Sequence, residues 1–134
     1  MSALASEESS LKSAPPMKFP RSLRLLRHAD FERVYERGRR HFLPHMTVFF
    51  LRRESGEGLR IGFTVSRALG GAVDRNRIKR RLREGVRLRC SITELPVDVV
   101  INPKRSLRTT EFETVLDEMA RAFESIRQKL VADV

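Results

Sequence analysis

The residues in this chain best suited to chemistry are arginines, and the chemistry they offer is phosphate binding. Between Arg75 and Arg89 the chain carries seven Arg, one Lys and a single acid, Glu84. A guanidinium group pairs with phosphate through two parallel hydrogen bonds, whereas a lysine offers only a point charge. Solvated helix faces usually mix acids with bases, and this stretch hardly does. We therefore interpret it as a surface for a polyanion, with nucleic acid favoured.

The spacing of the apolar residues gives this stretch its secondary structure. Ile78, Leu82 and Val86 recur every four residues, as on the buried side of an amphipathic helix. At about 100° per residue, a set of arginines fans out over the opposite face. These are Arg77, Arg80, Arg81, Arg83 and Arg87. The helix is expected to pack on a core with one side and to present guanidinium groups with the other.

The remaining reactive side chains do not describe an enzyme. General acid–base or metal-dependent hydrolysis needs histidines or carboxylates gathered at one site. Here they are scattered along the chain: Asp30, Glu32, Glu54, Glu57, Asp98, His28, His41 and His45. Cys90 is the only cysteine, which excludes an intramolecular disulfide, and we interpret it as a packed or half-exposed thiol. We predict no catalytic residue and no metal ligand in the protein.

A second set of residues suits single-stranded RNA. Phe31 and Tyr35 lie one helical turn apart, and Phe49 or Phe50 and Phe63 come from predicted neighbouring strands. Aromatic side chains along a groove can stack unpaired bases, each worth about 1–3 kcal/mol. The competing interpretation is core packing, which we favour for Phe63, whereas the hydroxyl of Tyr35 favours the groove. Which of Phe49 and Phe50 faces the groove stays open.

Composition sets the broad class. The chain has 134 residues, 40% of them hydrophobic, which fits one domain with a single core. Its net charge of +10 favours nucleic acid or an anionic membrane surface as partner. No apolar run approaches the roughly 18 residues of a membrane span, and no signal-type segment opens the chain. We expect a cytoplasmic protein with no membrane partner.

The elements that must position these residues can be read from periodicity and turn signals. Residues 1–20 lack periodicity and are predicted to form a disordered extension, which leaves 21–134 as the folded domain. We expect a helix from about residue 28 closed by Gly38, strands at 46–53, 59–66 and 97–101, the basic helix, and a last helix after Thr110. This order predicts an α+β sandwich with helices packed on a small sheet.

Together these pieces resemble the protein subunit of bacterial ribonuclease P over roughly residues 22–130. The matching segments are residues 30–35 with Gly38, 60–66, 70–73, 75–80, 83–84 and 98–101, followed by the C-terminal helix. The most specific of them reads Ala-Val-Asp-Arg-Asn-Arg-Ile-Lys-Arg, from Ala72 to Arg80. The resemblance implies a two-layer sandwich of about four strands and three helices with a left-handed β-α-β crossover.

The resemblance also implies a function. In that family a large RNA, which requires Mg²⁺, catalyses removal of the 5′ leader from precursor tRNA, and the protein binds both RNAs. The residues facing the catalytic RNA would be Arg75, Asn76, Arg77, Lys79, Arg80 and Arg83. The leader contacts would be Phe31, Tyr35, Phe49, Ser66 and Arg67. Ala68 stands where a second basic residue is common, so one RNA contact is expected to be missing.

Two other functions remain open from the sequence. A stand-alone RNA-binding protein, ribosomal or regulatory, could use the same basic helix. A protein-only nuclease is a second alternative, against which the scattered acids argue. Cleavage of precursor tRNA that survived complete removal of RNA would favour the nuclease.

Overall fold

The computed structural model describes residue 24, residues 27–54, residue 56 and residues 58–132. The predicted N-terminal extension, residues 1–20, lies outside this part of the chain. The elements in order are α1 (His28–Arg37), β2 (Arg39–Phe42), β3 (Met46–Arg52), β4 (Arg60–Phe63), α2 (Ala72–Arg89), β5 (Val97–Pro103) and α3 (Phe112–Ala132). Two 3-10 turns, η2 (Arg67–Leu69) and η3 (Arg105–Arg108), lie beside α2 and α3 in sequence.

One four-stranded mixed sheet organises the molecule, with the strand order β2-β3-β5-β4. β2 pairs antiparallel with β3, β3 pairs antiparallel with β5, and β4 pairs parallel with β5. The α+β class with three helices is therefore confirmed. The residue pattern alone predicted three strands and missed β2, because its sequence Arg-Arg-His-Phe carries no apolar alternation. Pairing with β3, and not propensity, makes this segment a strand.

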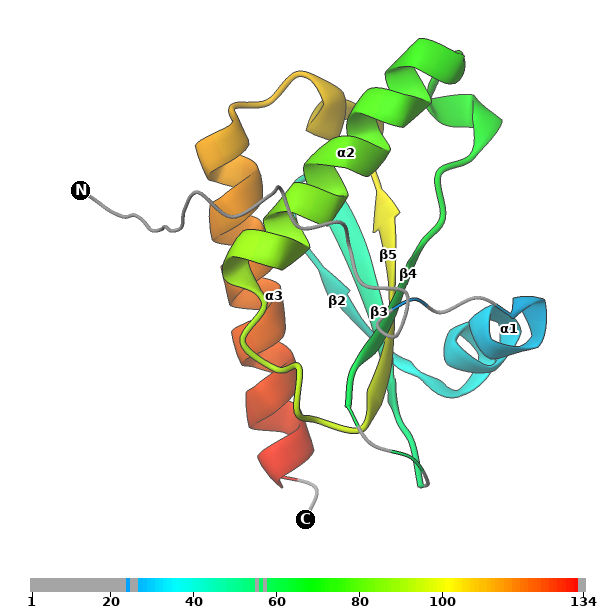
Figure 1. Cartoon of the computed structure of the whole chain (residues 1–134), viewed down its shortest axis with the longest axis vertical. Coiled ribbons are helices and arrows are strands. Elements are labelled where there is room, and N and C mark those ends of the chain that lie inside the picture. The colour runs from blue at the N-terminus through cyan, green and yellow to red at the C-terminus, as the bar shows by residue number, and fades with distance from the viewer. Residues whose placement is uncertain (1–23, 25–26, 55, 57, 133–134) are drawn as a thin grey trace, which may run out of the picture.

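The parallel pair β4 and β5 is joined through α2. In Figure 1 both strands point upward with α2 in front of the sheet, and at their upper ends β4 lies to the right of β5, to which the chain returns after α2. This is the left-handed sense of crossover that the family resemblance implied. About 98% of β-α-β connections are right-handed, so no local pattern in the sequence could have indicated it.

The sheet has one core face and a second face on which, among the described residues, α1 packs. Against the core face pack α2 and α3, around fully buried side chains that include Phe50, Ile101 and Phe123. Ile78, Leu82 and Val86 are all buried, which confirms the predicted inner side of the basic helix. α2 approaches α3 closely at Gly85, where an added Cβ would lie 3.0 Å from a methionine side chain.

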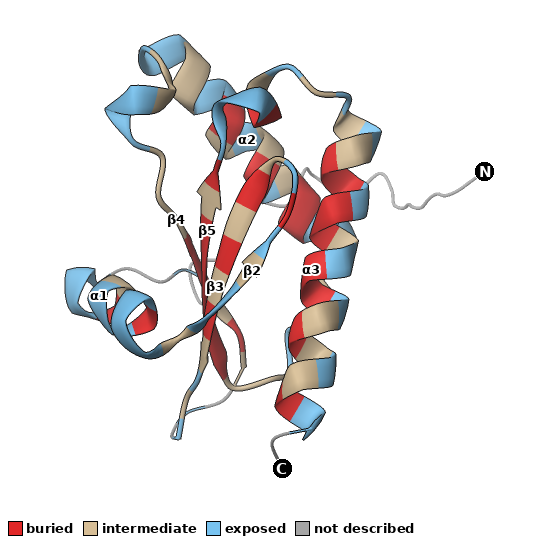
Figure 2. Cartoon of the chain, turned by 180° about the vertical axis from the view of Figure 1, so that it is seen from behind, coloured by how far each residue is buried: buried red, intermediate tan, exposed pale blue. Residues whose placement is uncertain are grey.

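On the other face α1 is held by a much smaller apolar cluster. Val34 packs on Val100, with Phe31, Phe49 and Leu51 partly buried around them. Figure 2 shows α1 set apart from the other two helices and exposed over most of its surface. Gly38 ends the helix as predicted, but its φ of −78° is not left-handed.

The close approach of α1 to the sheet supplies another reason for glycine at that position. A Cβ on Gly38 would lie 2.7 Å from the backbone oxygen of Phe50 on β3. A side chain there would push the end of α1 away from the strand.

The ends of the three predicted strands differ from the structure: the strand expected at 46–53 ends at Arg52, and the one expected at 97–101 continues to Pro103. The strand expected at 59–66 ends at Phe63, because after this residue the chain leaves the ladder with β5 and turns into η2. The last helix begins at Phe112, and its apolar residues are buried as predicted, including Met119, Phe123 and Ile126.

Candidate nucleic-acid interface

The outer side of α2 carries the first cluster of candidate RNA-binding side chains. Asn76, Arg77, Arg80 and Arg83 are exposed, whereas Arg75 and Lys79 are half-buried. Within the described part of the chain no salt bridge involves any of these six residues. Unneutralised guanidinium groups on a rigid helix are what a phosphate backbone requires. The structure thus places the six predicted residues on one helix, α2.

A cavity of about 480 Å³ lies along this helix. It is lined by Arg77, Arg80, Arg81, Glu84 and Phe112. Two exposed arginines, Arg77 and Arg80, therefore border a shallow hollow in the surface. Such a surface admits a phosphate while the helix and the start of α3 form its walls.

Two arginines that the helical pattern placed on the outer face have structural partners instead. Arg81 donates to the backbone oxygens of Leu107 at 2.8 Å and Thr110 at 2.7 Å, and its guanidinium lies 5.8 Å from the Phe112 ring centroid. Arg87 pairs with Glu84, one turn earlier. Arg87 is exposed on the outer face as predicted, whereas the placement of Arg81 was wrong, because η3 and the segment that follows it cover its guanidinium group.

The uncovered part of the second sheet face carries the aromatic residues predicted to bind a leader. The hydroxyl of Tyr35 lies 2.6 Å from Thr64 Oγ1 and donates to Asn102 Oδ1 at 2.9 Å. Its ring meets Phe49 edge-on, with centroids 4.9 Å apart and planes at 88°. Tyr35 remains 37% exposed. Its hydroxyl is held by two protein side chains, so the ring has a fixed position.

The alternation along β3 settles which phenylalanine faces this side. Phe50 is 1% exposed and belongs to the core, whereas Phe49 is half-buried beside Tyr35. Phe31 is also half-buried, in the small cluster under α1. Phe63 packs partly buried against the main core, which confirms the core interpretation for it. We call Phe31, Tyr35 and Phe49 the aromatic face.

Sequence reasoning missed an aromatic residue close to this surface. Phe42 is 67% exposed, and it pairs across the strands with Thr47, which in turn pairs with Asn102. Residues paired across strands share a sheet face, so Phe42 lies on the same side as Tyr35. The sequence pattern did not single out Phe42, because it follows three polar residues in β2, a strand that was not predicted.

The connection from β4 to α2 links the two candidate surfaces. Ser66 and Arg67 are exposed at the start of η2, two and three residues after Thr64, which contacts Tyr35. Four residues later Gly71 precedes the first turn of α2. The structure therefore brings the predicted leader residues and the predicted RNA-facing helix to adjoining positions along one stretch of chain.

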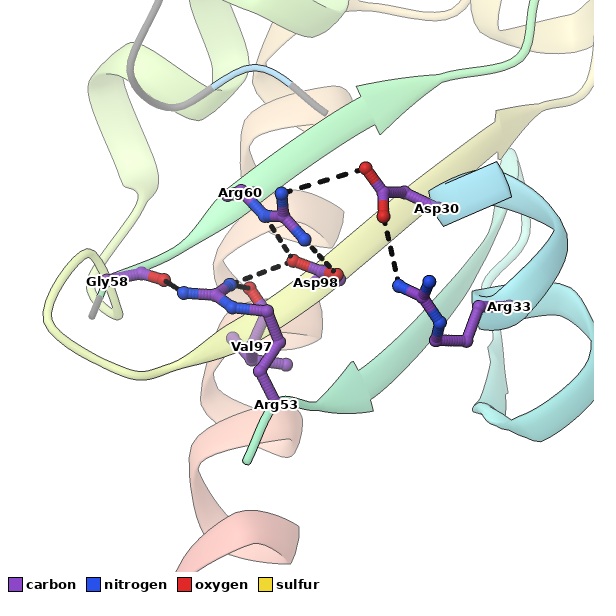
Figure 3. A network of polar contacts seen from close by, with 7 residues as sticks. All are labelled: Asp30, Arg33, Arg53, Gly58, Arg60, Val97 and Asp98. Atoms are coloured by element: carbon purple, nitrogen blue, oxygen red, sulfur yellow. Dashed lines mark hydrogen bonds and ion pairs between the residues drawn. The ribbon is translucent and has the colours of Figure 1, made fainter. Parts of the chain in front are cut away.

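A buried polar network fixes α1 on the sheet, as Figure 3 shows. Asp98 on β5 is 1% exposed, and it accepts from Arg53 at 2.8 Å and from Arg60 at 2.9 and 2.8 Å. Arg60 also lies 3.6 Å from Asp30 on α1, which accepts from Arg33 at 3.0 Å. The hydrogen bond to Asp98 raises the pKa of Arg60 above its usual value. The network ties α1 to β4 and β5 with charge-assisted bonds.

The histidines have structural contacts. His45 bonds the buried carboxylate of Glu118 through its backbone nitrogen, at 3.0 Å, and through its ring. Burial, followed by the charge of Lys129, lowers the pKa of His41.

Among the described residues no group of three or more His, Cys, Asp or Glu side chains could hold a metal ion.

The single cysteine is not an activated thiol. Burial raises the pKa of Cys90, which disfavours the thiolate form that acts as a nucleophile. No helix in the described part of the chain combines the length and apolarity needed to cross a membrane.

The chain is similar to known proteins in both sequence and fold. It is 40% identical to the ribonuclease P protein component of a Geobacter species over 111 residues, 83% of this chain and 94% of the relative. It is 49% identical to that of Desulfovibrio desulfuricans over 83 residues, covering 61% of this chain and 62% of the relative.

Solved structures give the same result. The RNase P protein from Thermotoga maritima, in complex with 1-(4-fluorophenyl)-2-thiourea, superposes with a TM-score of 0.64 at 25% identity, over 75% of this chain and 96% of that one. The Staphylococcus aureus RNase P protein, at 23% identity and a TM-score of 0.62, covers 81% of this chain and 94% of that one, and it supports the fold. The family model described as Ribonuclease P matches residues 19–127. With its fold, its basic helix and these relatives, the chain belongs to the ribonuclease P protein family, which acts with an RNA subunit in removing the 5′ leader of tRNA.

Proposed function

We propose that this chain binds the catalytic RNA of ribonuclease P through α2 and the single-stranded leader of precursor tRNA through the aromatic face. The residues assigned to the catalytic RNA are Arg75, Asn76, Arg77, Lys79, Arg80 and Arg83. Those assigned to the leader are Phe31, Tyr35, Phe49, Ser66 and Arg67. The RNA carries the catalytic chemistry, with Mg²⁺ that it binds itself, and the complex works in the cytoplasm.

The observation that supports this assignment best is the fixed position of Tyr35. Its hydroxyl is hydrogen-bonded to Thr64 and Asn102 while its ring stays 37% exposed. A preorganised, exposed ring loses little conformational entropy when a base stacks on it. Thr64 also leads directly through Ser66 and Arg67 into the basic helix. A leader crossing the aromatic face would thus emerge next to the surface assigned to the catalytic RNA.

Removing the ring of Tyr35 tests the leader assignment. Precursors with successively shortened leaders are bound to the reconstituted holoenzyme, with wild-type protein and with Tyr35→Ala. If the ring stacks on one base, the variant should weaken binding of the full-length precursor by about 1–3 kcal/mol and leave binding of mature tRNA unchanged. Its affinity for the RNA subunit should change little, because α2 lies on the other face of the sheet.

Tyr35→Phe is the matched control, since it keeps the ring and removes only the hydroxyl. It should retain most of the leader-dependent affinity. The assignment fails if wild type and Tyr35→Ala lose affinity in parallel as the leader shortens, because the ring would then make no contact that depends on the leader.

A further inference from the structure

A second group of arginines lies on the flank of α1 that faces away from the aromatic face. Asp30 and Val34 form the buried ridge of this helix. At about 100° per residue, Arg33 and Arg37 project to one side of that ridge and Tyr35 projects to the other. None of the arginines on this flank was predicted as a site residue from the sequence.

This flank borders a cavity with a volume of about 670 Å³. Its lining residues are Arg33, Arg37, Leu51, Arg52, Arg53, Glu54, Gly56, Arg60 and Asp98. A smaller cavity of about 200 Å³ adjoins it and shares Arg37, Leu51 and Arg52. The second cavity adds Arg39 from β2. The concave surface is therefore elongated, which suits a chain of anions better than a single ion.

The charge along this surface is predominantly positive. We call the arginines that line the two cavities the arginine track: Arg33, Arg37, Arg39, Arg52, Arg53 and Arg60. The acids that face them are Asp98 and Glu54 in the cavity lining and Asp30 beside it. Lys129 adds a further cation near the smaller cavity, because its ammonium lies 5.8 Å from the ring centroid of Phe50, which lines that cavity.

The carboxylates do not neutralise the track evenly. The buried Asp98 forms ion pairs with Arg53 and Arg60, and Asp30 forms ion pairs with Arg60 and Arg33. Arg52 donates to the backbone oxygen of Leu130 at 3.3 Å and has no carboxylate partner in the salt bridges of the described chain. Arg37 is exposed in the last turn of α1, and no hydrogen bond or salt bridge of the described residues engages its guanidinium. Arg37 and Arg52 thus keep an unneutralised positive charge, while Arg53 and Arg60 are held in place by Asp98.

We propose that the arginine track binds the sugar-phosphate backbone of RNA, at a site distinct from both α2 and the aromatic face. Phosphodiesters match the planar donor fork of arginine, and the two adjoining cavities allow successive phosphates to be contacted. The site does not depend on the leader assignment made for Tyr35. Its phosphates come either from the RNA subunit or from the precursor tRNA, and the two sources can be separated experimentally.

The salt dependence of binding tests the track. A variant that contacts one phosphate fewer should show a slope of log affinity against log salt that is smaller by about 0.7–0.9. Arg37→Ala is measured in two arms: the protein with the RNA subunit alone, and the assembled holoenzyme with precursor tRNA. A reduced slope in the first arm identifies the RNA subunit as the source, and a reduced slope only in the second identifies the precursor.

The controls separate a specific contact from general charge. Arg121→Ala removes one exposed arginine of α3 that lines neither cavity, and it should leave both slopes unchanged. Arg37→Lys keeps the charge and should retain most of the slope. Arg52→Ala on β3 repeats the test from a second element, so the outcome does not rest on α1 alone. If Arg37→Ala and Arg52→Ala match Arg121→Ala in both arms, the track does not bind RNA.

Discussion

Individual arginines in this protein are either exposed and available to a ligand or bonded to other protein groups, and the surrounding residues determine which. Arg77 and Arg80 are exposed along α2, whereas the next residue, Arg81, donates to the backbone oxygens of Leu107 in η3 and of Thr110. Helical periodicity alone could place all three on the outer face, and it could not indicate that another segment folds over one of them. Arg53 and Arg60 show the same limit, because their partner Asp98 is about forty residues away in sequence.

Asp98 is where a single substitution should destabilise the fold most clearly. Asp98→Asn keeps the shape but leaves two guanidinium groups without their carboxylate in a buried setting. Breaking a buried ion pair by removing one partner costs about 3–5 kcal/mol. Urea unfolding monitored by circular dichroism should show a loss of this order, whereas Asp117→Asn, at an exposed position on α3, should leave stability unchanged. Equal stability of the two variants would mean that the network contributes little.

At the scale of elements, the sequence was most informative where one helix carries two opposed faces. The apolar spacing of Ile78, Leu82 and Val86 predicted the buried side of α2, and all three are buried. β2 was not predictable, because its pairing with β3 outweighs a polar sequence. The position of α1 on the sheet could not be predicted from the apolar pattern either. It depends on the ion pair between Asp30 and Arg60 and on the close approach of Gly38 to β3.

Substitutions on the two faces of α2 should have opposite consequences. Leu82→Asp puts an unpaired charge into the core and should unfold the domain. Arg77→Ala with Arg80→Ala should leave the helix intact, since alanine is the better helix former. The double variant should bind the RNA subunit more weakly, with a salt slope lower by about 0.7–0.9 for each phosphate that these arginines contact. A folded Leu82→Asp protein with native circular dichroism would show that the orientation of α2 is wrong.

At the scale of the whole molecule, the sheet separates surfaces of different character. α2 presents arginines beyond one face, the other face carries the exposed ring of Tyr35, and the arginine track runs from the far flank of α1 to the end of α3. The net charge of +10 indicated a polyanionic partner but not how its contacts are divided. That division arises from the left-handed crossover and from the docking of α1, both of which are properties of the assembled sheet.

The proposed division of labour between the two surfaces is tested most directly with two RNAs and the effect of the protein on each. Affinities of the RNA subunit for precursor and for mature tRNA are measured with and without the protein, at one salt concentration. Because the aromatic face is proposed to hold the leader, the protein should tighten binding of the precursor well beyond that of mature tRNA. The advantage should shrink as the leader is shortened. Equal tightening of both RNAs at every leader length would contradict the proposal, since the protein would then act without contacting the leader.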